Sequence, residues 1–189
     1  KSVIAGEGGM ITTNNRELYL LAREYHDHGH MNNPSLPRGR DTHRIHGFNY
    51  RMTEIQAVIA KAQLEKLDYI VEKNRENYSI IESAFFGVKY LKFRKIPNQC
   101  KPLCDTLIVQ FDSKDIAGEF VTRIQSNGLG TKNVPDAIEW HFARYWDHML
   151  EHIGMSKMEL EKSLHISNKI IERSVALPIM VKTTKKDLE

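Results

Sequence analysis

The sequence predicts an α/β chain, and three observations lead to this fold class. Residues 1–13 contain a glycine-rich turn beside a β-branched run, a pattern typical of a turn between strands. Residues 53–86 show the apolar spacing of one long helix. From residue 87 onward, apolar patterns typical of strands alternate with patterns typical of helices. We therefore expect three parts, namely residues 1–52, a linking helix over 53–86 and a small C-terminal α+β domain over 87–189.

The composition is that of an ordinary soluble protein. The chain has 189 residues, of which 41% are hydrophobic and 27% charged, with a net charge of +3 and charges of both signs interspersed. No basic face is concentrated enough to favour nucleic-acid binding, and no apolar run approaches the roughly 18 residues of a membrane helix. No basic-then-apolar signal segment opens the chain. The two cysteines are too few for a disulfide framework, which favours a reducing cytoplasm.

The N-terminal part is expected to contain two short strands and a helix. Residues 3–13 read as strands around the glycine turn. Asn14 or Asn15 then caps a helix over residues 16–27, which Gly29 ends. The spacing of three and four residues predicts one buried face on this helix, formed by Leu18, Leu21, Ala22 and Tyr25.

A long polar loop follows over residues 30–47. It contains two prolines and two glycines, and arginine and histidine side chains gather between residues 38 and 44. Loops of this length in compact domains are usually functional or disordered. Two interpretations stay open: a mobile surface segment, or a basic flap over an anionic substrate.

The linking helix has the clearest start signal in the sequence. Thr53 and Gln56 fit a capping box, in which each side chain satisfies a free amide at the helix start. An apolar stripe continues from Ile55, with a mild break near 74–77, and Gly87 ends the helix.

The C-terminal part is predicted to mix strands and helices. Strands are expected over residues 88–94, 106–111 and 175–181. Ser113 is expected to cap a helix that ends at Asn127 and Gly128, and a further helix spans about residues 156–173.

Two ordered motifs resemble a known enzyme family. Lys1 followed by Gly6-Glu-Gly-Gly-Met-Ile-Thr-Thr13 is similar to the Schiff-base lysine segment of the DegT/DnrJ-type sugar aminotransferases. At a compatible distance, Gly47-Phe-Asn-Tyr-Arg-Met-Thr-Glu-Ile-Gln56 resembles a second segment of that family. The resemblance covers residues 1 to about 85 and is more diffuse beyond.

The resemblance implies a fold-type-I enzyme that uses pyridoxal 5'-phosphate (PLP). Residues 1–52 would then be the C-terminal end of the large PLP-binding domain together with a substrate loop. The family also needs an N-terminal half, which supplies the aspartate for the pyridine nitrogen, so we expect this chain to be inactive alone. A homodimer with shared active sites is implied as well.

One branch of the family is especially similar. His26-Asp-His-Gly-His30 and Asn32-Asn-Pro-Ser-Leu-Pro-Arg-Gly-Arg40 resemble the 8-amino-3,8-dideoxy-octulosonate transaminases, which aminate an eight-carbon ketosugar acid. We therefore expect amino transfer from an amino acid, with glutamate as the expected donor, to a ketosugar or ketosugar acid of cell-surface polysaccharide biosynthesis.

The resemblance also implies the site residues. Lys1 would hold PLP and carry the proton during transfer, because an amine kept neutral in a dry pocket is a nucleophile. Asn49 would donate to the cofactor phosphate of the neighbouring subunit. Arg51 would pair with a substrate phosphate or carboxylate through its forked donors, or fix the loop to the helix. His28 and His141 are expected on the substrate side.

Three alternatives remain beside this interpretation. A PLP-dependent sugar dehydratase would replace the lysine by histidine, which Lys1 argues against. A non-catalytic remnant of the fold would act through its surface. A metal-binding module would use the histidines between 26 and 30, although their spacing of two points the rings apart on a helix. Cys100 and Cys104 lack the second pair that a metal site needs, so we expect no metal.

The segment from Trp140 to His148 is rich in aromatic residues. It suits the apolar face of a sugar ring, with His141 or Arg144 meeting an acidic group. Core and interdomain packing is the competing interpretation.

Overall fold

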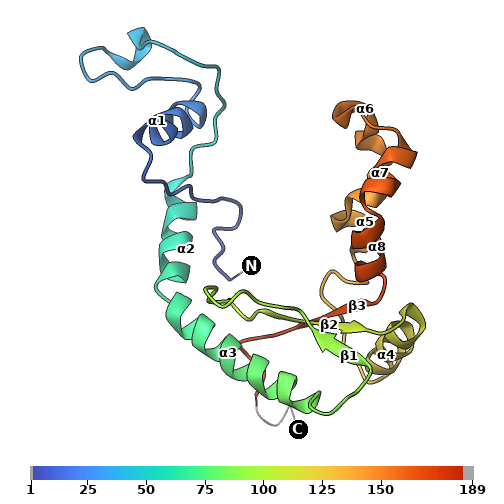
Figure 1. The fold of residues 1–189 in the computed structure, drawn as a ribbon. Helices are drawn as coiled ribbons and strands as arrows, with labels where there is room; N and C mark the ends of the chain where they lie inside the picture. Colours follow the sequence, from blue (N-terminus) through green and yellow to red (C-terminus); the bar gives the residue numbers. More distant parts are fainter. Residues whose placement is uncertain (1, 185–189) are drawn as a thin grey trace. The chain divides into compact units, whose positions relative to one another are not determined.

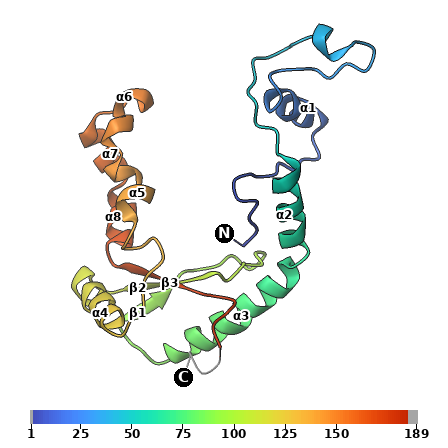
Figure 2. The ribbon, with the colours of Figure 1, turned by 180° about the vertical axis from the view of Figure 1, so that it is seen from behind.

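The computed structural model describes residues 2–184. The chain divides into two compact units, of which the first ends at Asp68 and the second begins at Tyr69. Figures 1 and 2 show the helices and strands that make up each of them. Lys1, the predicted catalytic residue, lies outside the described residues.

The first unit contains α1 (Arg16–Tyr25), the 3-10 turn η1 (Arg38–Arg40) and α2 (Glu54–Leu64). Asn15 caps α1, because its Oδ1 accepts the N–H groups of Glu17 at 2.9 Å and Leu18 at 3.2 Å. The capping box of α2 is also formed, with the Thr53 N–H donating to Gln56 Oε1 at 2.9 Å and the Gln56 N–H donating back to Thr53 Oγ1 at 3.3 Å. Both helix starts are as the sequence predicts.

The two strands predicted over residues 3–13 are not formed. A strand requires a hydrogen-bonded neighbour, and within residues 2–184 no segment pairs with this stretch. It is held instead by the Gln56 side chain, whose Nε2 donates to the Glu7 carbonyl at 2.7 Å, and by the buried Ala5. Helix α1 likewise ends at Tyr25, two residues before the predicted end.

The apolar residues of α1 that the spacing predicts to be buried are not its buried residues. Leu18 is 55% exposed and Tyr25 40% exposed, whereas the buried residue of this helix is Glu24. The apolar stripe of α2 is exposed too, with Ile55 at 76% and Val58 at 66%. The spacing predicted the helices correctly, but their apolar faces are open in this unit.

The predicted linking helix is divided in two. Helix α2 ends at Leu64 and α3 (Leu67–Ala84) follows after Glu65 and Lys66. The Lys66 N–H donates to Gln63 O at 3.1 Å, a three-residue step that tightens the ladder at the break. No glycine or proline marks the position, so the sequence carries no breaker signal there.

Helix α3 is continuous where the sequence suggested a mild break. Asn74 and Asn77 are buried, and the Asn77 Nδ2 donates to the Met180 carbonyl at 2.8 Å. Asn77 therefore fastens another segment of the second unit to α3, and neither asparagine interrupts the helix.

The second unit is built on a three-stranded antiparallel sheet in the order β1-β2-β3. Its strands are β1 (Leu91–Phe93), β2 (Thr106–Phe111) and β3 (Ser174–Pro178). In the central strand, Val109 pairs with Phe93 on one side and with Val175 on the other. The three predicted strands exist, although β1 and β3 are shorter than predicted.

The core lies on one face of β2. Leu107, Val109 and Phe111 alternate along this strand and are buried with Ala117, Val175 and Ile179. Side chains of α3 and of α4 (Lys114–Ser126) pack against this cluster. Figure 1 shows both helices beside the sheet. Ser113 caps α4 as predicted, since its Oγ accepts the Ile116 N–H at 3.2 Å. Helices on one face of an antiparallel sheet are an α+β arrangement.

Short helical segments complete the second unit. They are α5 (Ile138–His141), η2 (Ala143–Tyr145), η3 (Asp147–Met149), α6 (Leu150–Ile153), α7 (Lys157–Ser163) and α8 (His165–Ile171). The single helix predicted over residues 156–173 is divided at Leu164 into α7 and α8. Helix α7 contacts α8, and α8 contacts β3.

Candidate active site

Three of the predicted site residues lie together in the first unit. His28, Asn49 and Arg51 belong to two short segments that run side by side, one after α1 and one before α2. His141 is the last residue of α5 in the second unit and is exposed. Lys1 lies outside the described residues.

Backbone hydrogen bonds join the two segments of the first unit. The His28 N–H donates to Phe48 O at 2.9 Å, the Phe48 N–H to Tyr25 O at 2.8 Å and the Tyr50 N–H to His26 O at 2.9 Å. Asp27 and Asn49 face each other in an isolated antiparallel bridge. The positions of His28 and Asn49 are thus fixed by the main chain, although no regular sheet is present there.

Two glycines permit this close approach. A Cβ atom at Gly47 would lie 2.4 Å from the Gly29 nitrogen and 2.7 Å from the Tyr25 carbonyl oxygen. A Cβ atom at Gly29 would lie 2.1 Å from the Ile45 carbonyl oxygen, and Gly29 also has a φ of +84°. Any side chain at either position would push the segments apart.

A buried carboxylate lies between the segments. Asp27 is 5% exposed, and its Oδ1 accepts a hydrogen bond from Arg38 Nη2 at 2.7 Å. The same oxygen lies 3.5 Å from Arg51 Nε. The hydrogen bond from Arg38 lowers the pKa of Asp27, with smaller contributions from the charges of Arg38 and Arg51, while burial opposes them. Asp27 is therefore ionised at neutral pH.

Arg51 also fixes the Asn49 amide. The Arg51 Nε donates to Asn49 Oδ1 at 2.9 Å. An arginine nitrogen only donates, so the amide oxygen must face Arg51 and the amide NH2 group must face away. Both Asn49 and Arg51 are exposed. The pair can therefore present N–H donors to an anionic group.

The loop over residues 30–47 is tied to the rest of the first unit by ion pairs, and hydrogen bonds of its own hold its shape. Arg44 donates to both carboxylate oxygens of the buried Glu24, at 3.2 and 3.1 Å. Asp41 accepts the backbone N–H groups of Asn32, Asn33 and Thr42 at 2.7, 3.1 and 2.9 Å. Burial raises the pKa of Asp41, but these bonds together outweigh it and hold the pKa below its usual value.

The histidines near this loop do not converge on one point. His28 has a φ of +58° and is exposed. The rings of His28 and His30 are 6.4 Å apart, whereas those of His30 and His43 are 4.4 Å apart. His30 Nδ1 lies 3.4 Å from Asp41 Oδ2, an ion-pair distance without hydrogen-bond geometry. Across residues 2–184, no group of three or more histidine, cysteine or acidic side chains is placed to hold a metal ion.

The sequence assigns no role to Asp27 or Arg38. Both lie inside the two segments that resemble the octulosonate branch, where Asp27 also ends the predicted helix and Arg38 is one of several basic loop residues. Their contact spans 11 residues of chain and follows no helix or strand period. The sequence offers one signal for this contact: an acidic residue stands just before a loop rich in arginine and histidine.

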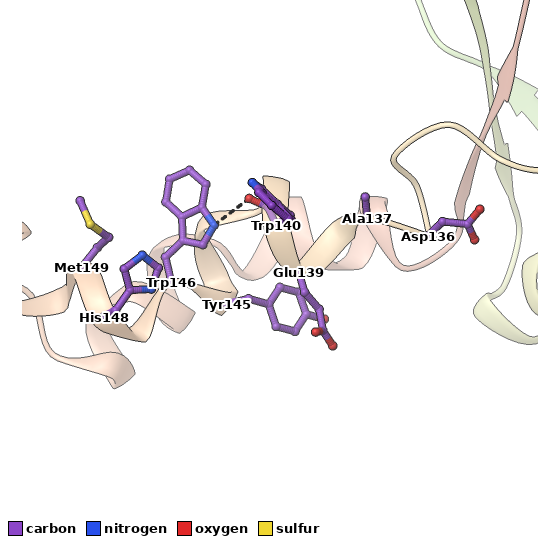
Figure 3. Close-up of a pocket in the computed structure, with 8 residues that line it drawn as sticks. All are labelled: Asp136, Ala137, Glu139, Trp140, Tyr145, Trp146, His148 and Met149. Atoms are coloured by element: carbon purple, nitrogen blue, oxygen red, sulfur yellow. Dashed lines mark hydrogen bonds between the residues drawn. The ribbon is translucent and has the colours of Figure 1, made fainter.

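The aromatic segment of the second unit forms an open pocket of about 770 Å³. Figure 3 shows its lining, which consists of Asp136, Ala137, Glu139, Trp140, Tyr145, Trp146, His148 and Met149. Trp140 is 81% exposed, so core packing does not account for it, and the Trp146 Nε1 donates to its carbonyl at 3.1 Å.

His141 and Arg144, the residues predicted to meet an acidic group of the sugar, do not line this pocket. Arg144 lies 3.3 Å from Glu172 in an ion pair. The charged residues of the pocket are acidic. The pocket is therefore suited to sugar hydroxyls or an amine, and an acidic group would meet repulsion there.

Across the described part of the chain, no helix is both long and apolar enough to cross a membrane.

Comparison with known proteins links these features to one family. A family model described as the DegT/DnrJ/EryC1/StrS aminotransferase family matches residues 1–189. The GDP-perosamine synthase of Caulobacter vibrioides is 48% identical over 68 residues, which are 36% of this chain and 17% of that protein. The UDP-4-amino-4,6-dideoxy-N-acetyl-beta-L-altrosamine transaminase of Campylobacter jejuni is 30% identical over 102 residues, 53% of this chain and 26% of that protein.

A solved structure has the same fold. The sugar aminotransferase CalS13 from Micromonospora echinospora superimposes with a TM-score of 0.72 and 17% identity, over 97% of this chain and 46% of that one. This likeness confirms the predicted fold class, α/β of fold-type I. The chain spans less than half the length of each of these three proteins.

Proposed function

Because the chain belongs to the DegT/DnrJ/EryC1/StrS aminotransferase family, we propose that it is the C-terminal part of a PLP-dependent sugar aminotransferase. The enzyme transfers an amino group from an amino acid, with glutamate as the donor, to a ketosugar or ketosugar acid. The match of the family model to residues 1–189 carries this proposal. The named relatives, a GDP-perosamine synthase and a UDP-sugar transaminase, support a sugar as the acceptor.

The donor groups of the first unit fit the phosphate of PLP. Asn49 presents a neutral NH2 group whose direction Arg51 fixes, and the Arg51 side chain is itself 47% exposed. The N–H groups of a neutral amide and of a positively charged guanidinium are both good donors to phosphate oxygens. When bound, PLP supplies the electron sink for amino transfer. In this proposal Asn49 holds the phosphate, Lys1 holds the cofactor and moves the proton, and Arg51 adds positive charge on the substrate side.

Two histidines are proposed as substrate contacts. His28 is exposed on the segment after α1, and His141 is exposed at the end of α5. Each would meet the substrate in the complete enzyme. The specific substrate that we propose is the eight-carbon ketosugar acid. Its aminated product would serve cell-surface polysaccharide biosynthesis, and we propose that the reaction takes place in the cytoplasm.

We further propose that the active enzyme is a homodimer with shared sites and that this 189-residue chain alone does not transaminate. Exposed apolar side chains in the first unit support the need for further protein surface, with Met10 and Ile11 each 77% exposed. Amino transfer by the isolated chain, supplied with PLP and glutamate, would contradict this part of the proposal.

An absorption spectrum of the complete protein tests the central claim. Adding PLP should produce the visible band of the lysine-bound cofactor, and adding glutamate should then discharge it. Lys1→Ala should remove both the band and turnover, whereas Lys61→Ala, at an exposed position in α2, should keep both. A complete protein that shows no band would be a non-catalytic remnant of the fold. A Lys1→Ala variant that keeps band and turnover would place the chemistry on another lysine.

A further inference from the structure

We propose that Asp27 is a positioning residue, which acts through Arg51 to hold the Asn49 amide with its NH2 group toward an anionic phosphate. The proposal rests on the function above, because the phosphate is that of PLP. It gives Asp27 a role that neither the motifs nor the comparisons assign to it.

The first step is the contrast in burial around Asp27. The side chain of Asp27 is 8% exposed, whereas those of Arg38 and Arg51 are 53% and 47% exposed. A long exposed arginine normally samples many rotamers, and a surface ion pair restrains it little. A buried carboxylate is different, because it is itself fixed and needs compensating charge. Asp27 therefore restrains the two arginines more than they restrain it.

The second step is the transfer of this restraint to Asn49. Asp27 Oδ1 lies 3.5 Å from Arg51 Nε, and the same Nε donates to Asn49 Oδ1 at 2.9 Å. One guanidinium nitrogen is thus shared between the buried carboxylate and the amide oxygen. The amide oxygen must remain there as long as Arg51 does, because arginine offers no acceptor to the NH2 group.

The third step concerns what the amide leaves free. Within residues 2–184, the structure gives the Asn49 Nδ2 no acceptor. The backbone bridge between Asp27 and Asn49 keeps the two residues in register, so the donor direction is set by the side chains alone. Without the charge on Asp27, Arg51 is released and the amide can rotate about its terminal torsion, which has a broad energy profile.

Glu24 provides a matched control for a merely structural role. It is a second buried carboxylate, three residues earlier in the last turn of α1, 4% exposed, and it accepts two hydrogen bonds from Arg44. Within residues 2–184, no hydrogen bond or ion pair joins Glu24 to Asn49 or Arg51. Glu24→Gln should therefore reproduce the general damage of removing a buried charge, without the effect on Asn49.

The experiment compares the affinity of the complete apoprotein for PLP and for pyridoxal, which has the aldehyde but lacks the phosphate. Asp27→Asn should weaken PLP about 2- to 10-fold, the range expected when one side chain loses its preorganisation. The affinity for pyridoxal should stay unchanged, so the ratio of PLP affinity to pyridoxal affinity should fall. Glu24→Gln should leave this ratio as in the wild type. Equal weakening of both ligands by Asp27→Asn would overturn the proposal, as would a matching change of ratio in Glu24→Gln.

A double-mutant cycle with Asn49→Ala identifies the route of the effect. In the Asn49→Ala background, Asp27→Asn should change the ratio no further. A ratio that Asn49→Ala itself leaves unchanged would refute the proposed phosphate contact, and the positioning role with it. A ratio lowered by Asn49→Ala but not by Asp27→Asn would refute the positioning role alone.

A second variant covers the case in which Asp27→Asn does not fold. Arg51→Lys keeps the positive charge near Asp27 but lacks the Nε–H that faces the amide oxygen. It should lower the same ratio, and this loss should vanish when Asn49 is alanine. A loss that persists in that background would show that Arg51 acts on the phosphate without Asn49, contrary to the proposal.

Discussion

At the scale of single residues, Asn49 and Arg51 divide two tasks between them. Arg51 contacts both a buried acid and an amide oxygen, whereas Asn49 has its donor group turned away from that pair. A neutral amide donor binds phosphate without adding another charge, and its neighbour supplies the positive potential. The arrangement favours an anion that accepts from nitrogen donors.

The first prediction tests the donor of Asn49. In the complete protein, Asn49→Ala should weaken PLP by about 10- to 150-fold, because a hydrogen bond to a charged group contributes about 1.5–3 kcal/mol. The fold should remain stable, since Thr53 and Gln56 still cap α2. Titration of the visible band measures the affinity. Asn14→Ala, at an exposed asparagine ahead of α1, is the control and should bind PLP as the wild type does.

The second prediction concerns acid and the Asp27–Arg38 pair. The folded protein lowers the pKa of Asp27 from its usual 3.8, first through the Arg38 hydrogen bond. The unfolded chain therefore takes up the proton at a higher pH than the folded one. The stability from this pair is fully present above pH 3.8 and is lost as the pH falls through the lower folded value.

The measurement is chemical unfolding of the wild type and of Asp27→Asn between neutral and acid pH. The wild type should be more stable by a constant margin at neutral pH, and this margin should shrink only below pH 3.8. A margin that shrinks already between pH 7 and 5 would mean that the pKa of Asp27 is raised, contrary to the contacts described.

The sequence brings residues together where their spacing is short. Asn49 and Arg51 are two positions apart in one motif, and their side chains do contact each other, while their roles toward cofactor and substrate stay predictions. Asp27 and Arg38 meet across a loop, and that loop is closed by Gly29, Gly47 and several backbone bonds. Local periodicity carries no information about such a loop closure, so the sequence did not predict that Asp27 contacts both arginines.

At the scale of elements, the paired segments around residues 25–29 and 47–50 position the site more than any helix does. Their approach depends on two positions without a Cβ atom. Gly47 is the cleaner test, because its φ lies outside the left-handed range and only steric contact matters there.

The third prediction is that Gly47→Ala lowers the free energy of unfolding by about 1–3 kcal/mol, the usual effect of overpacking. The added methyl group would meet backbone atoms of Gly29 and Tyr25 at 2.4 and 2.7 Å, and backbone yields less easily than a side chain. Denaturant unfolding measures the change. Gly39→Ala, where a Cβ atom meets nothing within 4 Å, should change stability by no more than about 0.5 kcal/mol. Equal effects of the two variants would refute the steric account.

Element starts were predictable from the sequence, and element interruptions were not. Asn15, Thr53 and Ser113 all cap the helices that the sequence assigned to them. A cap acts within three residues and so leaves a local signature. The break at Glu65–Lys66 occurs among good helix formers, where the path of the chain prevails over propensity. The break at Leu164 has no glycine or proline beside it either.

At the scale of the whole molecule, the two units differ in how completely they bury their apolar residues. The second unit has a buried cluster around Leu107, Val109 and Val175. In the first unit, the apolar side chains of α2 remain exposed, with Ile55 at 76% and Val58 at 66%. The sequence predicts the apolar stripe from its period, but periodicity does not identify what covers it. A further part of a longer enzyme and a second subunit would both provide such cover, which agrees with the proposed shared site.

The fourth prediction tests the shared site with a mixed dimer of the complete protein. One subunit carries Lys1→Ala and the other carries Asn49→Ala. If Asn49 serves the cofactor of the neighbouring subunit, both defects fall in one site. The other site combines an intact Lys1 with an intact Asn49 from across the interface, so it should bind PLP with the wild-type affinity.

The opposite arrangement gives a different titration. If each subunit uses its own Asn49, the mixed dimer has no site with both residues intact, and its lysine-bearing site should show the weakened affinity of the Asn49→Ala homodimer. Dimers isolated by two different affinity tags allow the comparison, with the two homodimeric variants as references. Because the expected weakening is about 10- to 150-fold, the two arrangements are separable by a single PLP titration. A weak lysine-bearing site in the mixed dimer would exclude donation across the interface and place Asn49 beside the Lys1 of its own chain.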